Sequence, residues 1–130
     1  MVVHTLRTAL KTGKTAFGAW LTVPGYFHAR TVGQSSRHLS WVVIDCEHGH
    51  ISLNPGASES VNGIISASPL GSPSAVIRIP ATGDSDSSSW QIKLALDAGA
   101  HGVMVPMVSL FKHRTLIKLL RRGFISGINR

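Results

Sequence analysis

The chain is poor in cysteine and in charged residues, and it has no long apolar run. Its 130 residues include a single cysteine, Cys46, which excludes a small secreted scaffold held together by internal disulfides. No stretch approaches the roughly 20 consecutive apolar residues that a membrane-crossing helix needs. Charged residues make up 15% of the chain, well below the usual level of about one quarter, so a disordered polyelectrolyte is excluded. The first residues also lack the charged and apolar segments of a secretory signal, and we therefore expect a cytoplasmic protein.

Acidic residues are scarce, and they are absent from one end of the sequence. Residues 1–108 contain all 6 acidic residues and 7 of the 13 Lys and Arg residues, which gives a net charge of +1. Residues 109–130 contain the other 6 basic residues and no acid, which gives a net charge of +6. We therefore predict a near-neutral domain at 1–108 and a basic tail of different character at 109–130, instead of the basic surface typical of nucleic-acid-binding domains.

Four short apolar runs recur along the near-neutral part, separated by segments with helical character. Because each run is almost continuously apolar, the runs are typical of strands buried on both faces of a parallel sheet. The predicted strands are 16–23, 41–45, 75–79 and 102–106. The predicted helices are 3–12, 26–36, a weak one within 53–70, and 88–98, which follows a serine-rich loop at 85–89.

This alternation of strands and helices indicates βα units in an α/β fold. Right-handed crossovers leave two architectures: a doubly wound sheet, or part of a (β/α)8 barrel. Four units in about 110 residues would make half of a barrel of roughly 250 residues. A flavodoxin-like sheet with five such units is the competing fold.

Polar side chains gather where the predicted strands end, which is where α/β folds place their functional groups. Asp45, Glu47, His48 and His50 follow the second strand, and Arg78 lies at the end of the third. Two carboxylates and two imidazoles could bind a metal ion, but neighbours in an extended strand point to opposite faces and cannot all converge. A solvated strand end is the alternative, and Arg78 could either form a structural salt bridge or bind an anion.

Other candidate residues have simpler interpretations. Cys46 lies in an apolar strand and is interpreted as a small core residue. The remaining histidines have no metal-ligand spacing, so surface positions are expected for all of them: His4, His28, His38, His101 and His113.

Five motifs in order resemble the HpcH/HpaI aldolase/citrate lyase family. They are Gly-Ala-Trp at 18–20, Trp-Val-Val-Ile-Asp-Cys-Glu-His-Gly at 41–49, Val-Ile-Arg-Ile-Pro at 76–80, Ile-Lys-Leu-Ala-Leu-Asp-Ala-Gly-Ala at 92–100, and Gly-Val-Met-Val-Pro-Met-Val at 102–108. The most similar branch comprises the 2-keto-3-deoxy and 2,4-dihydroxyhept-2-enedioate aldolases. The similarity extends over about residues 5–108, so it includes the first four βα units of the barrel.

The resemblance implies a metal-dependent (class II) pyruvate aldolase with a TIM-barrel fold. Such an enzyme cleaves a 4-hydroxy-2-oxo acid to pyruvate and an aldehyde, and a divalent ion (Mg2+, Mn2+ or Co2+) stabilises the enolate. The resemblance also implies that His48 is the catalytic histidine, that Asp97 is the aspartate paired with it, and that Arg78 binds the substrate. Intact members tend to form homo-oligomers, and no nucleic-acid or membrane partner is expected.

The metal site is where the sequence departs from this family. Glu47 and Asp45 resemble polar groups around the metal and its waters, and Trp20 resembles a wall of the substrate pocket. The two carboxylates that bind the metal in the family would lie beyond residue 108, and residues 109–130 contain no acid. We therefore expect no metal ligands in this chain, and weak or absent aldolase activity from it.

The basic tail does not match the family, and this motivates the hypothesis of a truncated or frame-shifted aldolase. Two other interpretations remain: a non-catalytic fragment that associates with full-length subunits, and a basic binding module that uses the tail. Residues 115–122 interleave basic and apolar residues, as in an amphipathic helix, although an ordinary surface helix is the favoured interpretation.

Overall fold

The computed structural model describes residues 4–68, 71–81 and 85–107, in which four parallel strands alternate with helices. The strands are β1 (Phe17–Leu21), β2 (Leu39–Asp45), β3 (Ser74–Arg78) and β4 (Gly102–Met104). The helices are α1 (Thr5–Thr12), α2 (Tyr26–Gln34), α3 (Gly56–Ile65) and α4 (Ser85–Asp97). The predicted strands and helices are therefore confirmed in type and order within the described residues. The predicted division at residue 108 and the tail at 109–130 lie outside the described residues.

The strand order identifies the architecture. The sheet runs β1-β2-β3-β4, and every neighbouring pair is parallel. A doubly wound sheet reverses its order at a switch point, as in 2-1-3-4-5, whereas a (β/α)8 barrel adds strands in sequence. The sequential order therefore selects a partial barrel of four βα units over the flavodoxin-like alternative.

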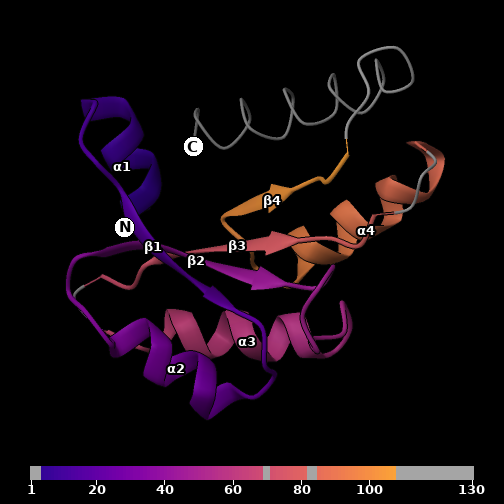
Figure 1. Cartoon of the computed structure of the whole chain (residues 1–130), viewed down its shortest axis with the longest axis horizontal. Helices are drawn as coiled ribbons and strands as arrows, with labels where there is room; N and C mark the ends of the chain where they lie inside the picture. Colours follow the sequence, from indigo (N-terminus) through magenta and orange to yellow (C-terminus); the bar gives the residue numbers. More distant parts are fainter. Residues whose placement is uncertain (1–3, 69–70, 82–84, 108–130) are drawn as a thin grey trace.

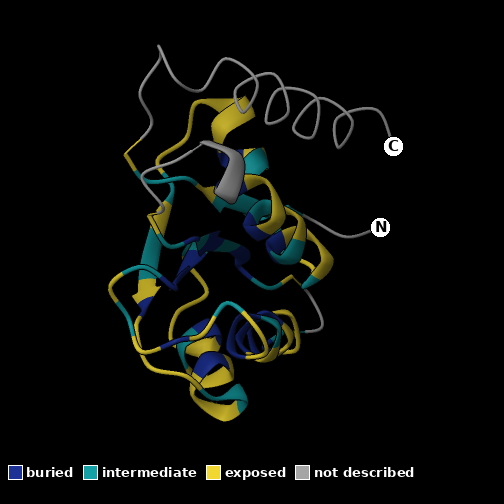
Figure 2. Cartoon of the chain, turned by 90° about the vertical axis from the view of Figure 1, so that its right-hand side faces the viewer, coloured by how far each residue is buried: buried dark blue, intermediate teal, exposed yellow. Residues whose placement is uncertain are grey.

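One face of the sheet is packed against helices α2 and α3, which both lie below it in Figure 1. The core forms here from alternate strand residues such as Leu21, Val42, Ile44 and Ile77, each at most 1% exposed. In Figure 2, buried positions in dark blue lie on the sheet and on the helices beneath it. Within the described residues, no helix is both long and apolar enough to span a bilayer.

The other face of the sheet carries the alternate set of strand residues. Trp41 lies flat over Gly18 of the neighbouring strand, so close that a Cβ at position 18 would come within 1.9 Å of the indole ring. The indole N–H of Trp41 donates to the carbonyl oxygen of Ala16 at 3.2 Å. Only glycine fits at position 18, because any side chain there would occupy the volume of the ring.

Two helix ends show how local sequence decides the boundaries. Gly99, two residues after the end of α4, has φ 89°, as expected for a glycine that ends a helix in a left-handed conformation. The predicted loop at 85–89 is wrong, because α4 already begins at Ser85. Serine and aspartate are favoured in the cap and first turn of a helix, so a serine-rich run can begin a helix as readily as precede one.

Candidate active site at the carboxyl edge of the sheet

An ion pair joins the last residues of two neighbouring strands. Asp45 ends β2, Arg78 ends β3, and the parallel register places the two side by side. Arg78 Nε donates to Asp45 Oδ1 at 2.9 Å and Nη2 donates to Oδ2 at 2.5 Å. The side chains are 4% exposed for Asp45 and 19% exposed for Arg78. A bidentate contact of this kind fixes the orientation of the guanidinium as well as its position.

The Asp45 carboxylate also organises the turn that follows β2. Its Oδ1 accepts the backbone N–H groups of Glu47 and His48, each at 3.0 Å. The hydrogen bond from Arg78 and these backbone donors outweigh the opposing effect of burial and lower the pKa of Asp45 to about 2. Asp45 is therefore ionised at neutral pH, and its oxygens are already engaged by donors of this chain.

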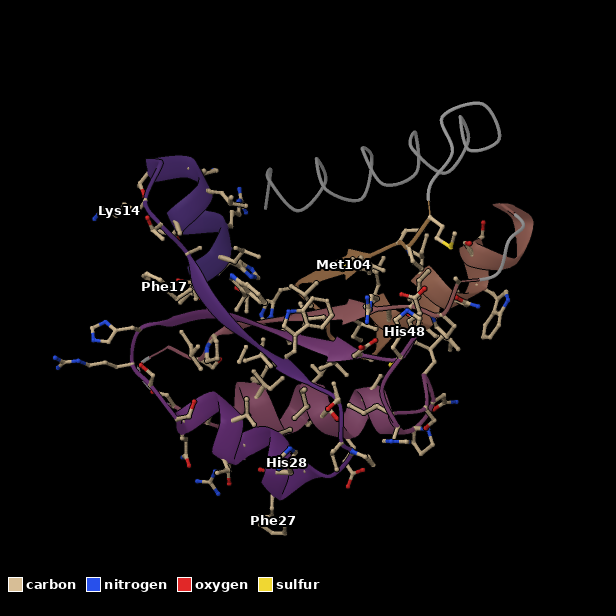
Figure 3. All side chains as sticks on the ribbon, viewed as in Figure 1. Lys14, Phe17, Phe27, His28, His48 and Met104 are labelled. Atoms are coloured by element: carbon tan, nitrogen blue, oxygen red, sulfur yellow. The ribbon has the colours of Figure 1, made fainter. Side chains whose placement is uncertain are left out.

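Glu47 lies between the arginine and the histidine. Its Oε2 is 3.3 Å from Arg78 Nε and 3.7 Å from His48 Nε2. The Glu47 side chain is 9% exposed, whereas that of His48 is 73% exposed. Figure 3 shows His48 at the carboxyl edge of the sheet, at the opposite end from Lys14 and Phe17. The cluster therefore presents an accessible imidazole next to an arginine that is paired with two carboxylates.

An aromatic ring completes the surroundings of Arg78. The guanidinium carbon lies 4.7 Å from the centre of the Trp20 ring, which is a cation–π distance. Trp20 is in β1 and is 47% exposed. The guanidinium of Arg78, which belongs to β3, is thus contacted by Trp20 of β1 and by Asp45 of β2.

The described residues do not by themselves form a metal site. No group of three or more His, Cys, Asp or Glu side chains in the described ranges is arranged to hold an ion. Asp45 is occupied by Arg78 and by backbone donors, and Glu47 is turned toward Arg78. A divalent ion at this edge would need carboxylates in addition to these two.

Cys46 is a core residue, as the sequence predicted. It is 8% exposed, and burial together with the charge of Asp45 raises its pKa to about 11. A thiol with this pKa is protonated at neutral pH and is not suited to act as a nucleophile.

Comparison with known proteins shows relatives over most of the chain. No family model matches. The chain is 34% identical over 102 residues to a hydroxypyruvate/pyruvate aldolase of Agrobacterium fabrum, covering 78% of this chain and 34% of that protein. It is 32% identical over 106 residues to a 4-hydroxy-2-oxovalerate aldolase of Novosphingobium aromaticivorans, covering 82% of this chain and 36% of that protein. The chain is a distant homologue of HpcH/HpaI-type aldolases. It spans about a third of the length of the aldolases it matches.

Solved structures agree on the fold. Macrophomate synthase superimposes with a TM-score of 0.67 at 23% identity, covering 88% of this chain and 36% of that one. The citrate synthase SbnG superimposes with a TM-score of 0.61 at 24% identity, covering 79% of this chain and 37% of that one. The described part thus corresponds to about a third of a TIM-barrel enzyme.

Within this chain the structure does not bring Asp97 into contact with His48, and the pairing inferred from the aldolase resemblance stays a prediction. Asp97 is the last residue of α4 and forms an ion pair with Lys93 one turn earlier. The end of α4 leads into the start of β4, at the amino edge of the sheet, whereas His48 follows the end of β2. In a βα unit these two places lie at opposite edges, and the carboxylate beside the His48 ring is that of Glu47.

Two histidines that the sequence placed on the surface are partly buried instead. His28 and His38 are exposed as expected, but His101 accepts a hydrogen bond from the backbone N–H of Ala75, and its ring packs against His4. His113 lies outside the described residues. No sequence signal connects His4 with His101, because they are almost the length of the described chain apart and meet only when α1 docks.

Proposed function

We propose that the carboxyl edge of the sheet is the 2-oxo-acid-binding part of a pyruvate-type aldolase site. The observation that carries the proposal is the arginine Arg78, held by Asp45, Glu47 and Trp20 beside the accessible ring of His48. The homology to hydroxypyruvate/pyruvate and 4-hydroxy-2-oxovalerate aldolases supports the same reaction class. The reaction is the retro-aldol cleavage of a 4-hydroxy-2-oxo acid to pyruvate and an aldehyde.

Arg78 is the group proposed to bind the acid. Its contacts with the two carboxylates are made through Nε and Nη2, so the proposal assigns the substrate carboxylate and keto oxygen to the side of Nη1. A guanidinium held in place before the substrate arrives needs little reorganisation as negative charge develops on the keto oxygen. Trp20 then forms a wall beside the bound acid and limits the movement of Arg78.

His48 is the group proposed to move the proton. Imidazole is the side chain suited to proton exchange near neutral pH, and the Glu47 carboxylate lies 3.7 Å from His48 Nε2. His48 removes the proton of the C4 hydroxyl, the C3–C4 bond breaks, and its electron pair becomes the enolate of pyruvate while the aldehyde leaves. Protonation at C3 then completes pyruvate. A divalent ion of the class II type would add Lewis-acid stabilisation of the enolate.

Binding of pyruvate to the isolated chain tests the proposal directly. We expect pyruvate to shift the side-chain NMR signals of Arg78 and His48 in a saturable way. Arg78→Lys removes the planar fork but keeps the charge, so it should weaken binding at least about tenfold. The matched control is Arg37→Lys, an exposed arginine before β2, which should bind as the unaltered chain does.

Turnover is the second measurement. Because the described residues lack a complete metal-ligand set, we expect weak or absent pyruvate release from a 4-hydroxy-2-oxo acid with added Mn2+ or Mg2+. An affinity for pyruvate that is unchanged in Arg78→Lys would contradict the proposal. Turnover that depends on His48 would show that the chain supplies more of the site than we assign to it.

A further inference from the structure

Helix α1 is attached to the sheet by few apolar contacts. It has eight residues, of which only Ala9 is buried, and Leu10 is 63% exposed. Isolated helices shorter than about 12 residues are marginal in water, so α1 depends on its docking for stability. Polar contacts from its first turn, made by Thr5 and Leu6, join it to the sheet.

The first turn of α1 bonds to the amino ends of β2 and β3. Thr5 Oγ1 donates to the carbonyl oxygen of Ser40 at 2.6 Å and accepts the backbone N–H of Ser74 at 3.1 Å. The backbone N–H of Leu6 donates to Ser74 Oγ at 3.2 Å. Ser74, the first residue of β3, therefore bonds to both Thr5 and Leu6 of α1. Figure 1 shows α1 near the amino ends of the strands.

Two histidines meet directly beside this contact. The backbone N–H of Ala75, the residue after Ser74, donates to His101 Nδ1 at 3.0 Å, and the backbone N–H of His101 donates to the carbonyl oxygen of Ala75 at 2.8 Å. The His101 ring also packs edge-on against that of His4, with 4.7 Å between centroids and 77° between planes. His4 is the residue that precedes α1, so the ring pair joins the helix to the sheet.

We propose that His4 and His101 form a pH-sensitive latch, which holds α1 on the sheet while His101 is neutral and releases it when His101 is protonated. The hydrogen bond from Ala75 requires a lone pair on Nδ1. Protonation places a hydrogen on Nδ1, so the N–H of Ala75 loses its acceptor, and the ring must leave its place beside Ala75. A charged His101 is also poorly solvated where it lies and is repelled by a charged His4.

The sign of the effect follows from the surroundings of His101. Burial, and then the charge of His4, lower its pKa below the ordinary 6.5. The undocked form therefore binds the proton more readily than the docked form does. Docking is at full strength above about pH 6.5 and weakens as the pH falls through that value toward the lowered pKa.

Other charges near the latch do not reverse this direction. Of the charged side chains of the chain, His4 is the one that affects the pKa of His101 within the described residues. The titratable and charged side chains on the described elements around the latch are His4, Arg7 and Lys11 from α1, Arg37 and His38 before β2, and Lys93 and Asp97 from α4.

Hydrogen exchange of the 130-residue chain tests the latch. Protection factors corrected for intrinsic exchange should fall about fivefold or more for the α1 amides Thr8 and Ala9 between pH 7.5 and pH 5.0. Those of Ile44 and Ile77 in the core should stay unchanged. His101→Asn keeps an acceptor near the position of Nδ1 but cannot be protonated, so its α1 should stay protected at both pH values.

Two further variants sharpen the result. His4→Gln removes the neighbouring charge, so the pH midpoint of release should move upward toward 6.5 while release persists. His38→Asn alters an exposed histidine on the same side of the molecule and should behave as the unaltered chain does. The proposal is overturned if the unaltered chain keeps equal α1 protection at pH 5.0 and 7.5, or if a folded His101→Asn chain loses it to the same extent. Should His101→Asn not fold, the unaltered chain and His4→Gln still decide the question.

Discussion

The two edges of the sheet are built from different chemistry. At the carboxyl edge, Arg78 and the carboxylates of Asp45 and Glu47 form a charged cluster. At the amino edge, uncharged groups hold the structure together: the hydroxyls of Thr5 and Ser74 and the ring of His101. A charged cluster fixes a side chain ready for an anionic substrate, whereas a neutral network holds a short helix only while its members stay neutral.

Removing Arg78 should have the largest effect. Arg78→Met leaves Asp45 and Glu47 facing each other, with Asp45 only 4% exposed, and should lower the free energy of unfolding by about 3 kcal/mol. Urea denaturation at pH 7 measures the loss. Lys93→Met is the matched control, because it breaks the exposed ion pair with Asp97 and should cost less than about 1 kcal/mol. Equal losses in the two variants would contradict the special role of the carboxyl edge.

Acid should weaken the two edges in separate pH ranges. Because the pKa of Asp45 falls from 3.8 to about 2 on folding, its contribution is complete above pH 4 and disappears as the pH drops toward 2. The contribution is on the order of 2 kcal/mol. The amino edge should weaken earlier, just below pH 6.5, because the pKa of His101 is lowered.

Asp45→Asn separates these two ranges. Urea denaturation as a function of pH should show that the free energy of unfolding of this variant falls less below pH 4 than that of the unaltered chain. The fall in the free energy of unfolding just below pH 6.5 should be retained. If the free energy of unfolding falls below pH 4 as much as in the unaltered chain, other carboxylates cause that fall.

Thr5→Val should loosen the amino edge without disturbing the charged cluster. The variant leaves the N–H of Ser74 and the carbonyl of Ser40 without their partner, at a cost of about 1 kcal/mol. Hydrogen exchange of the α1 amides measures this loosening. Thr8→Val removes only an exposed bond to the backbone of His4 within the helix, so it should change little. Pyruvate binding should be the same in both variants.

Trp20→Leu should have the smallest effect on stability. It removes the ring beneath the Arg78 guanidinium, a contact worth about 0.5–1 kcal/mol at an exposed site, but it leaves both carboxylates in place. Pyruvate affinity should fall several-fold because Arg78 becomes less restricted, and Trp20→Phe should restore part of it. An affinity unchanged in Trp20→Leu would exclude Trp20 from the proposed pocket.

Much of the fold was predictable because its signals are local. Continuously apolar runs indicated the strands around Val43 and Ile77, and Gly99 marked the end of α4. The site was predictable in part, since parallel strands bring their carboxyl ends to one edge and so place Asp45 near Arg78. The doubt whether neighbouring polar residues could converge was resolved by the turn after β2, where Asp45 binds the backbone of Glu47 and His48.

The sequence by itself determined which segments become strands and helices, and that the polar residues after β2 and β3 lie at one edge. Only the tertiary structure decided which groups touch. It directed Glu47 toward Arg78, left His48 accessible, kept Asp97 at the opposite edge, and packed the partly buried His101 against His4. The reason is physical: hydrophobic periodicity is a property of a few consecutive residues, whereas an ion pair or a ring contact depends on the register of strands and the docking of helices far apart in the chain.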